Sequence, residues 1–251
     1  MHFMYEAFLC WKISLIPYLT LSNQSKNLMV HPFFKISPFK RMLSYLVPVT
    51  IANSRGKQNR FLEFILYRNQ WQLATEDALY SDGTRYEPFN VAFKYASKEK
   101  LNNLSNSLIL GTGLGSIVQI LHAKYKTKSA FTLVEYDETI LKWALESLST
   151  MGIRNLKPYC GYAEDFVKED KDRYDLLCID IFTGREVPAQ FTEKDFLTAT
   201  KKLLKPGGLW IMNYIVNDAM ETMQFLSNVK SLFPDVEVIE KNQNMILVAE
   251  H

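Results

Sequence analysis

Strand-like and helix-like segments alternate regularly through the second half of this 251-residue chain. Apolar runs typical of buried strands lie at 107–110, 130–135, 157–160, 174–179 and 209–214. Helical patterns lie between them at 116–124, 138–149, 164–168 and 193–204. Because each helix carries the chain back across the sheet, this order predicts an α/β fold with parallel strands covered on both faces.

The end of the chain departs from this parallel pattern. A helical segment at 217–233 is followed by two strand-like runs, 236–240 and 245–249, with only four polar residues between them. Two strands so close in sequence pair in the antiparallel direction. We therefore expect a mostly parallel sheet that ends in a C-terminal antiparallel hairpin.

The segment 42–85 is expected to form a small N-terminal β region. Its strand-like runs lie at 43–51, 61–67 and 71–75. Asparagine tolerates turn conformations, so the last two runs are predicted to form a hairpin at Asn69. Apolar residues at helical spacing then predict a helix over 86–95 that leads into the main domain, 86–251.

The N-terminal extension, 1–41, matches neither region. It is aromatic and apolar in patches, but Pro17, Pro32 and Pro38 interrupt it. A secretory signal needs a continuous apolar stretch and a small-residue cleavage site, and a membrane span needs about 18 or more apolar residues. The sequence therefore disfavours a signal or an anchor. Initiation of translation at Met42 is an alternative reading of this extension.

Charge and cysteine content bound the class of function. The 29 basic and 27 acidic residues give a formal net charge of +2, which favours no nucleic-acid partner. The three cysteines form no CxxC pair and have no histidine cluster nearby, so neither a disulfide framework nor a metal site is expected. This composition is typical of a cytoplasmic protein.

A glycine loop follows the first strand of the alternating region. Gly111, Gly113 and Gly115 allow the backbone to approach a ligand, and the following helix offers free N–H groups. Glu135 ends the next strand, 20 residues after Gly115, where a carboxylate can accept hydrogen bonds from two ribose hydroxyls. Together these residues indicate an adenosine-bearing cofactor. A tight turn without a ligand, with Glu135 at a solvated strand end, is the structural alternative.

Further acidic residues follow two other strands. Asp180 ends the apolar run 174–179, at the sheet edge where open α/β folds bind ligands, and could orient an amine or accept its proton. A loop-ordering role is the alternative. Asp165 and Glu164 follow the third strand, where a carboxylate can reach an adenine amino group or stabilise the first helical turn.

Other polar residues are assigned structural roles. Tyr86 could line a substrate entrance, but aromatic packing is favoured. Cys160 and Cys178 lie within apolar strands and are interpreted as core residues rather than nucleophiles. Thr192 and Asp195 have the spacing of a capping box at a helix start.

These motifs resemble the spermidine synthase-like branch of the S-adenosylmethionine-dependent methyltransferase superfamily. The similarity spans about residues 60–215 and includes the glycine loop, 134–137, 174–180, Pro188, 191–196 and 204–208. It implies a Rossmann-like methyltransferase sheet that binds S-adenosylmethionine or its decarboxylated form. It also implies that the three loop glycines wrap the cofactor, that Glu135 holds its ribose, and that Asp180 faces the reacting end. Members of this branch commonly form homodimers.

Three departures from that branch bear on the reaction. Aminopropyltransferases have acidic residues where this chain has Leu114 and Thr183, and Tyr162 stands in place of their adenine-binding aspartate, which Asp165 could replace. The leading hypothesis is therefore methyl transfer to a small-molecule acceptor, with no nucleic acid or membrane as partner. Aminopropyl transfer to a polyamine and a non-catalytic cofactor-binding protein are the alternatives.

Overall fold

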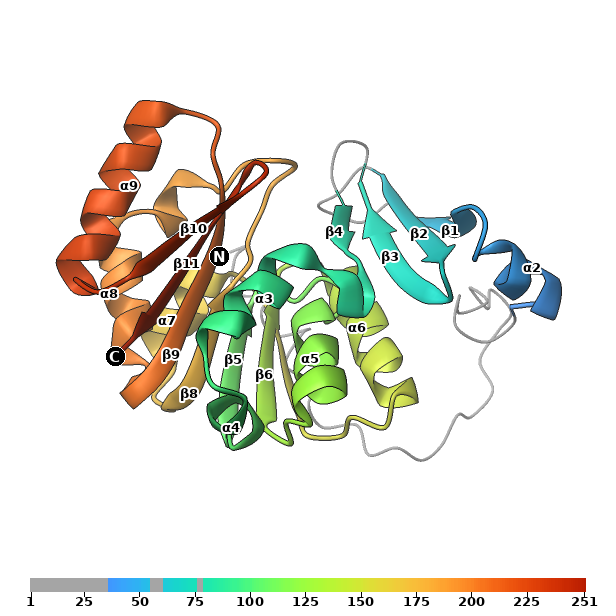
Figure 1. The fold of residues 1–251 in the computed structure, drawn as a ribbon, viewed down its shortest axis with the longest axis horizontal. Coiled ribbons are helices and arrows are strands. Elements are labelled where there is room, and N and C mark those ends of the chain that lie inside the picture. The colour runs from blue at the N-terminus through green and yellow to red at the C-terminus, as the bar shows by residue number, and fades with distance from the viewer. Residues whose placement is uncertain (1–35, 55–60, 76–78) are drawn as a thin grey trace, which may run out of the picture.

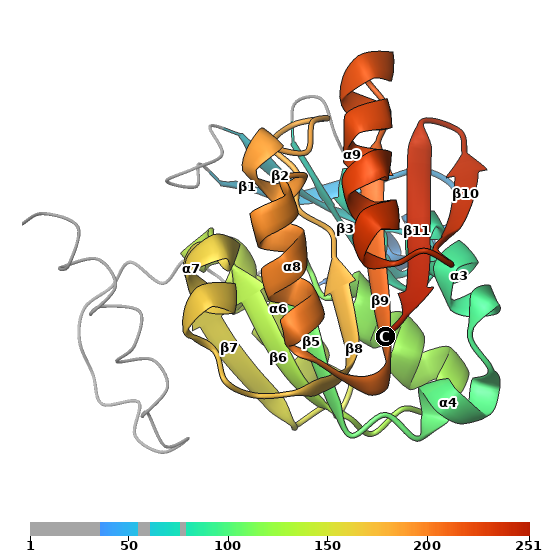
Figure 2. The same cartoon turned by 90° about the vertical axis from the view of Figure 1, so that its left-hand side faces the viewer.

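The computed structural model describes residues 36–54, 61–75 and 79–251. It contains two β-sheets, the larger of which carries helices on both faces (Figures 1 and 2). Most of the N-terminal extension, residues 1–35, lies outside the described part of the chain. Within that described part, no helix combines the length and apolar character needed to cross a bilayer.

The larger sheet has seven strands in the order β10-β11-β9-β8-β5-β6-β7. They are β5 (Asn106–Leu110), β6 (Ala130–Glu135), β7 (Leu156–Cys160), β8 (Tyr174–Ile179), β9 (Leu204–Ile215), β10 (Glu237–Lys241) and β11 (Asn244–Glu250). Neighbours from β9 to β7 are parallel, whereas β11 pairs antiparallel with both β9 and β10. The expected mostly parallel sheet with a C-terminal antiparallel hairpin is confirmed.

Two sets of helices cover the two faces of this sheet. One buried core lies beneath α3 (Glu87–Ala92), α5 (Ser116–Ile120) and α6 (Glu138–Thr150), and the other beneath α7 (Ala163–Glu169), α8 (Lys194–Lys202) and α9 (Ala219–Leu232). Side chains alternate between faces along a strand, so Cys178 of β8 joins the first core and Leu177 the second. Burial on both faces explains the near-continuous apolar character of the parallel strands.

Shorter helical segments connect these elements. They are α2 (Pro38–Leu43), η2 (Gly83–Arg85), η3 (Phe93–Tyr95), α4 (Lys98–Asn102), η4 (Leu121–Tyr125) and η5 (Ala189–Phe191). The helix expected over 86–95 is divided into α3 and the 3-10 segment η3, and the one expected over 116–124 into α5 and the π-helical η4. Hydrophobic spacing therefore located both helices but not the change in their winding.

The smaller sheet has four antiparallel strands in sequence order. They are β1 (Val49–Ser54), β2 (Leu62–Tyr67), β3 (Gln70–Ala74) and β4 (Leu79–Ser81). The predicted hairpin is confirmed, since β2 pairs with β3 and Asn69 has a φ of 57°. One apolar cluster joins this sheet to the glycine loop and α6, and consists of Leu62, Phe64, Leu73, Leu114, Ile140 and Trp143. Figure 1 shows the sheet seated beside α6.

The strand expected over 43–51 is wrong for its first half. Pro38 occupies the first helical turn of α2, and Ser37 Oγ caps that helix by accepting a hydrogen bond from the Lys40 backbone N–H (3.2 Å). The strand therefore begins only at Val49, after a turn.

The capping box expected before α8 does not form. Glu193 occupies the N-cap position without a side-chain cap. Thr192 Oγ1 instead donates to the Ala189 carbonyl (2.8 Å) and closes the preceding 3-10 turn. The Thr192 hydroxyl therefore stabilises the end of η5 rather than the start of α8.

Candidate active site

The glycine loop joins β5 to α5 at the carboxyl edge of the larger sheet. Gly111, Gly113 and Gly115 have φ values of 83°, 51° and 78°, in the left-handed region that favours glycine. A Cβ on Gly111 would lie 2.2 Å from the Asp180 carbonyl oxygen, and one on Gly113 would lie 2.5 Å from Ser81 Oγ. The loop therefore requires glycine for its own packing as well as for any ligand.

The three glycines do not contribute equally to the adjacent pocket. Gly111 and Gly113 line it, whereas a Cβ on Gly115 would meet Leu148 of α6 at 2.8 Å. Gly115 thus serves the packing of α5 on α6. The cofactor role expected for all three glycines stays a prediction, and this geometry supports it best for the first two.

Glu135 ends β6 and turns its carboxylate toward the glycine loop. Its Oε2 accepts hydrogen bonds from the backbone N–H groups of Thr112 and Gly113 (both 3.1 Å), and its Oε1 accepts from Asp137 N–H (3.2 Å). Burial raises the pKa of Glu135, while these backbone donors act in the opposite direction. A carboxylate has about four acceptor positions, so at least one remains for a ligand hydroxyl.

Asp180 lies at the carboxyl end of β8, and its hydrogen bonds converge on one oxygen. Oδ1 accepts from Tyr86 Oη (3.0 Å) and from Asn213 Nδ2 (3.0 Å). The pKa of Asp180 is raised to about 7, chiefly by burial; the two hydrogen-bond donors partly oppose this rise, and the nearby Glu135 carboxylate adds to it. The group can therefore exchange a proton near neutral pH.

Tyr86 and Asn213 were not identified from the sequence as partners of Asp180. Burial, and to a lesser extent the Asp180 carboxylate, raise the pKa of Tyr86 well above its usual value, so the hydroxyl keeps its proton. The packing role favoured for Tyr86 is thus incomplete. Asn213 interrupts the apolar run of β9, and that polar residue in a buried strand was the available signal.

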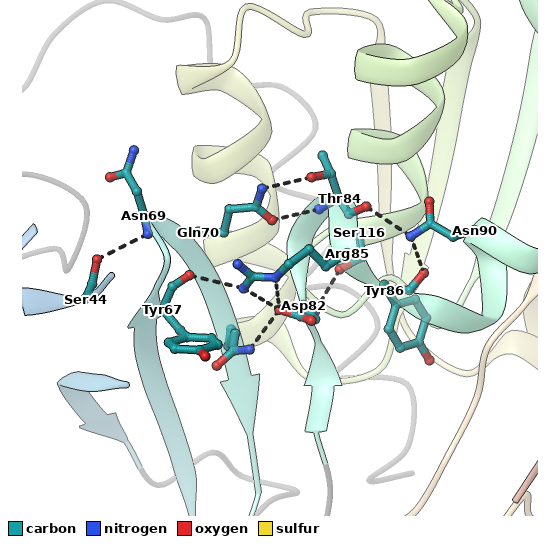
Figure 3. A network of polar contacts seen from close by, with 11 residues as sticks. Ser44, Tyr67, Asn69, Gln70, Asp82, Thr84, Arg85, Tyr86, Asn90 and Ser116 are labelled. Carbon is teal, nitrogen blue, oxygen red and sulfur yellow. Dashed lines mark hydrogen bonds and ion pairs between the residues drawn. The ribbon is translucent and has the colours of Figure 1, made fainter. Parts of the chain in front are cut away.

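A polar network holds the turn that carries Tyr86 (Figure 3). Asp82 Oδ1 accepts from Arg85 Nη2 (2.7 Å) and from Gln72 Nε2 of the small sheet (2.8 Å). The Asn90 amide donates to the Tyr86 carbonyl (2.8 Å). The N-terminal sheet and α3 therefore fix the position from which Tyr86 reaches Asp180.

A pocket of about 260 Å³ lies at this edge of the sheet. Its lining includes Gly111, Gly113, Glu135, Asp180 and Glu164. The strand order places Asp180 after β8 at one side and Glu164 after β7 at the other, with the glycine loop between them. We call this cavity the glycine-loop pocket.

The two acidic residues that begin α7 differ in position. Glu164 lines the glycine-loop pocket, and its Oε2 is buried with no hydrogen-bond partner among the described residues. Asp165 is exposed and does not line the pocket. The predicted adenine contact of Asp165 remains untested, and the geometry favours its neighbour.

Two tyrosines form part of the pocket rim. The rings of Tyr136 and Tyr162 lie 4.3 Å apart between centroids, and their hydroxyls are 2.7 Å apart. Both rings line the glycine-loop pocket. The residue that replaces the family's adenine-binding aspartate therefore presents an aromatic surface there.

The other two departures from the family pattern have different environments. Leu114 is fully buried in the cluster beneath the small sheet, and its N–H donates to Ser81 Oγ (2.7 Å). Thr183 is exposed at the pocket rim and pairs through its backbone with Glu186. Neither position supplies an acidic side chain.

A second pocket, of about 560 Å³, lies next to the first. The two pockets share Tyr80 and Phe182 as lining residues. Tyr86 and Asn213, which hold Asp180, line the second pocket. Asp180, which lines the glycine-loop pocket, is therefore hydrogen-bonded to two residues of a separate cavity bounded by the N-terminal region and the C-terminal hairpin.

A known protein family matches most of the larger domain of this chain. The family described as methyltransferase domain matches residues 101–248. A probable polyamine aminopropyl transferase of Bifidobacterium longum is 30% identical over 112 residues, which are 45% of this chain and 24% of that protein. The human eEF1A lysine and N-terminal methyltransferase is 26% identical over 157 residues, 57% of this chain and 22% of that protein.

Solved structures share the fold at low sequence identity. A probable spermidine synthase from Corynebacterium glutamicum has a TM-score of 0.64 and 19% identity, and covers 81% of this chain and 81% of its own. Human methyltransferase-like protein 13, solved in complex with SAH, has a TM-score of 0.54 and 23% identity, and covers 66% of this chain and 80% of its own. Both support the Rossmann-like methyltransferase fold.

The share of each protein that a match covers determines whether the match shows the family of this chain. The chain spans about a quarter of the length of the two curated relatives above, 24% and 22%. The family match, by contrast, covers more than half of the chain, residues 101–248. The chain therefore belongs to the methyltransferase domain family, within the superfamily of S-adenosylmethionine-dependent methyltransferases.

Proposed function

We propose that this protein is an enzyme that transfers a methyl group from S-adenosylmethionine to a small-molecule acceptor. The observation that carries the proposal is the glycine-loop pocket, which offers three separate acidic positions at one sheet edge: Glu135, Glu164 and Asp180. The buried and unpartnered Glu164 Oε2 indicates a missing hydrogen-bond donor, because buried acceptors are nearly always satisfied.

The residues of this pocket fit the three parts of that cofactor. The remaining acceptor position of Glu135 suits a ribose hydroxyl, and Glu164 Oε2 suits the adenine amino group. Asp180, at the opposite side, then faces the reacting end. When bound, the cofactor supplies a methyl group on a positively charged sulfur, and the protein mainly aligns donor and acceptor.

Aminopropyl transfer from the decarboxylated cofactor is the second candidate. Similarity to proteins named polyamine aminopropyltransferase, from Bifidobacterium longum and from Vibrio vulnificus, favours it. The charges around Asp180 favour methyl transfer instead. A polyamine stripped of water needs compensating carboxylates, and Leu114 and Thr183 do not provide them.

Calorimetric titration tests the choice of cofactor. The full chain would be titrated with S-adenosylmethionine, S-adenosylhomocysteine and decarboxylated S-adenosylmethionine, with NAD as the control. Tighter binding of the first two supports methyl transfer. Preference for the decarboxylated form would replace it with aminopropyl transfer, and binding without any transfer would favour a non-catalytic cofactor-binding protein.

We also propose that the enzyme is located in the cytoplasm and forms a homodimer. The balanced charge and the lack of cysteine motifs support a reducing compartment. The dimer rests on the resemblance to the spermidine synthase-like branch. Light scattering on the purified chain tests the oligomeric state, and a monomer at micromolar concentration would contradict the dimer.

A further inference from the structure

Asn213, which lines the second pocket, has a buried acceptor atom without a donor. Asn213 is 1% exposed, and its Nδ2 donates to Asp180 Oδ1 (3.0 Å) and to Tyr86 Oη (3.3 Å). These two contacts fix the amide orientation. The other end of the amide, Oδ1, is buried and has no hydrogen-bond partner among the described residues.

A buried carbonyl oxygen without a donor is costly, on the order of 1–3 kcal/mol. Asn213 lines the second pocket beside the carboxylate of Asp180. A ligand that presents an N–H group at this point would satisfy Oδ1. An O–H group could also satisfy Oδ1, but the adjacent Asp180 carboxylate attracts a cation, so the pair favours an acceptor whose reactive atom is an amine nitrogen.

The charged residues of the second pocket differ in whether a described residue of opposite charge pairs with them. Asp82 is paired with Arg85 (2.7 Å), and Glu87 lies 3.6 Å from the Lys241 ammonium. The Arg185 guanidinium also lines this pocket, and it donates to the amide oxygen of Gln243. Among the described residues no carboxylate pairs with Arg185 in an ion pair.

The position of Arg185 is fixed by its loop. The Gly184 N–H donates to Tyr80 Oη (3.0 Å), and the Asn217 amide donates to the Arg185 carbonyl (2.9 Å). These contacts fix the backbone of the loop, and the exposed Arg185 side chain is positioned by its bond to Gln243. An excess cation at this point repels a polyamine and attracts an anionic group.

We propose that the second pocket binds a small acceptor that carries both an amine and an anionic group, with the amine at Asn213 and Asp180 and the anion at Arg185. This assignment rests on the proposed methyl transfer and names its substrate class, which is that of an amino acid. Both positions are needed to define this substrate class. A simple amine would leave the Arg185 guanidinium without an anionic partner.

The reaction at this pocket balances without a further reactant. Asp180 accepts a proton from the ammonium form of the acceptor, and Asn213 Oδ1 holds an N–H of the resulting amine. The nitrogen lone pair forms the new bond to the methyl carbon, and the carbon–sulfur bond breaks with its electron pair left on sulfur. The products are an N-methylated ammonium compound and S-adenosylhomocysteine.

Three acceptors matched in chain length test the substrate class. The full chain, saturated with S-adenosylhomocysteine, would be titrated with 4-aminobutyrate, butylamine and 1,4-diaminobutane, and with the two- and six-carbon members of each series. The three series differ only in the far end, which is anionic, apolar or cationic. Methyl transfer from labelled S-adenosylmethionine to each compound provides a second readout.

We expect one amino acid of the series to bind at least tenfold more tightly than its monoamine and its diamine. Arg185→Met should remove that preference while the affinity for S-adenosylhomocysteine stays unchanged. Arg154→Met is the matched control, because this arginine is exposed and its side chain donates to Ser149 Oγ at the distant end of α6. Asn213→Ala should weaken the amine series and the amino acid series alike, by about tenfold.

Two kinds of result would overturn the assignment. Preference for the diamine, equal binding of all three series, or no binding by any of them while S-adenosylhomocysteine binds would refute the acceptor class and leave the cofactor assignment standing. Failure of S-adenosylhomocysteine to bind would refute the proposed methyl transfer itself. Unchanged preference in Arg185→Met would refute the role of that guanidinium.

Discussion

The two pockets share Tyr80 and Phe182 but are built in different ways. The glycine-loop pocket is formed mainly by one continuous part of the chain, and its central acid is held by backbone N–H groups of the glycine loop. The second pocket takes side chains from the N-terminal region, β9 and the C-terminal hairpin. The strand ends and the glycine loop thus form the proposed cofactor pocket, whereas contacts between segments far apart in the sequence form the proposed acceptor pocket.

Asp180→Asn should have the largest effect, because Asp180 lines the glycine-loop pocket and binds Tyr86 and Asn213 of the second pocket. We expect turnover of the best acceptor to fall by about 10²- to 10⁴-fold, the usual contribution of general acid–base catalysis. Affinity for S-adenosylmethionine, measured by calorimetry, should change little, since Glu135 and Glu164 are untouched. Full activity in this variant would remove Asp180 from the mechanism.

The same substitution should also change the pH dependence of stability. The pKa of Asp180 is raised to about 7 in the folded protein, so between about pH 4 and 7 the folded state binds more protons than the unfolded state. The free energy of unfolding of the wild type therefore falls as pH rises through this window. Urea unfolding at pH 5 and pH 8 should show a smaller fall for Asp180→Asn, by about 1–3 kcal/mol. An identical fall in both proteins would contradict the burial of this carboxylate.

Leu114→Ala tests whether the side chain of Leu114 in the glycine loop belongs to the hydrophobic core rather than to an amine-binding site. Leu114 is fully buried beneath the small sheet, so its truncation should cost about 2–5 kcal/mol of stability in urea unfolding. Leu46, which is 79% exposed, provides a matched control whose truncation should change stability by about 0.5 kcal/mol or less. Equal effects at the two positions would show that the small sheet is not anchored through Leu114.

Glu135→Ala should act mainly on the glycine-loop pocket, which Glu135 lines and whose loop it binds. The loss of ribose hydrogen bonds should weaken S-adenosylmethionine binding by about 1–3 kcal/mol, or roughly 5- to 150-fold. Calorimetry measures this change directly. Binding of the acceptor in the second pocket should stay within about twofold, and unchanged cofactor affinity would contradict the ribose assignment.

A pair of adjacent substitutions should give the smallest effect. Glu164→Ala removes the buried, unpartnered carboxylate oxygen and should weaken cofactor binding by about 0.5–1.5 kcal/mol. Asp165→Ala, at an exposed position outside the pocket, should leave the affinity unchanged. The reverse result would support the adenine contact first expected for Asp165.

The sequence predicted the larger sheet well because its strands carry local patterns. The apolar runs that end at Leu110, Glu135 and Ile179 coincide with β5, β6 and β8, and the C-terminal pair forms the expected hairpin. The strand expected over 43–51 failed, since a proline and a capping serine locally favour a helix over a strand. Short-range chemistry therefore explains both the success and the failure.

The residues of the proposed acceptor pocket were harder to predict from the sequence. Tyr86 and Asn213 are separated by more than a hundred residues, and only the packing of α3 against β9 brings both to Asp180. A tyrosine near a helix start is usually a packing residue. The asparagine within an apolar strand was visible, but its partner was not.

A crystal structure of the full chain with S-adenosylhomocysteine tests the central claim most directly. We expect the ribose hydroxyls within hydrogen-bond distance of Glu135, the adenine amino group at Glu164, and the sulfur beside Asp180, on the side toward the second pocket. A ligand bound elsewhere, or with its sulfur turned away from Asp180, would contradict the assignment of both pockets.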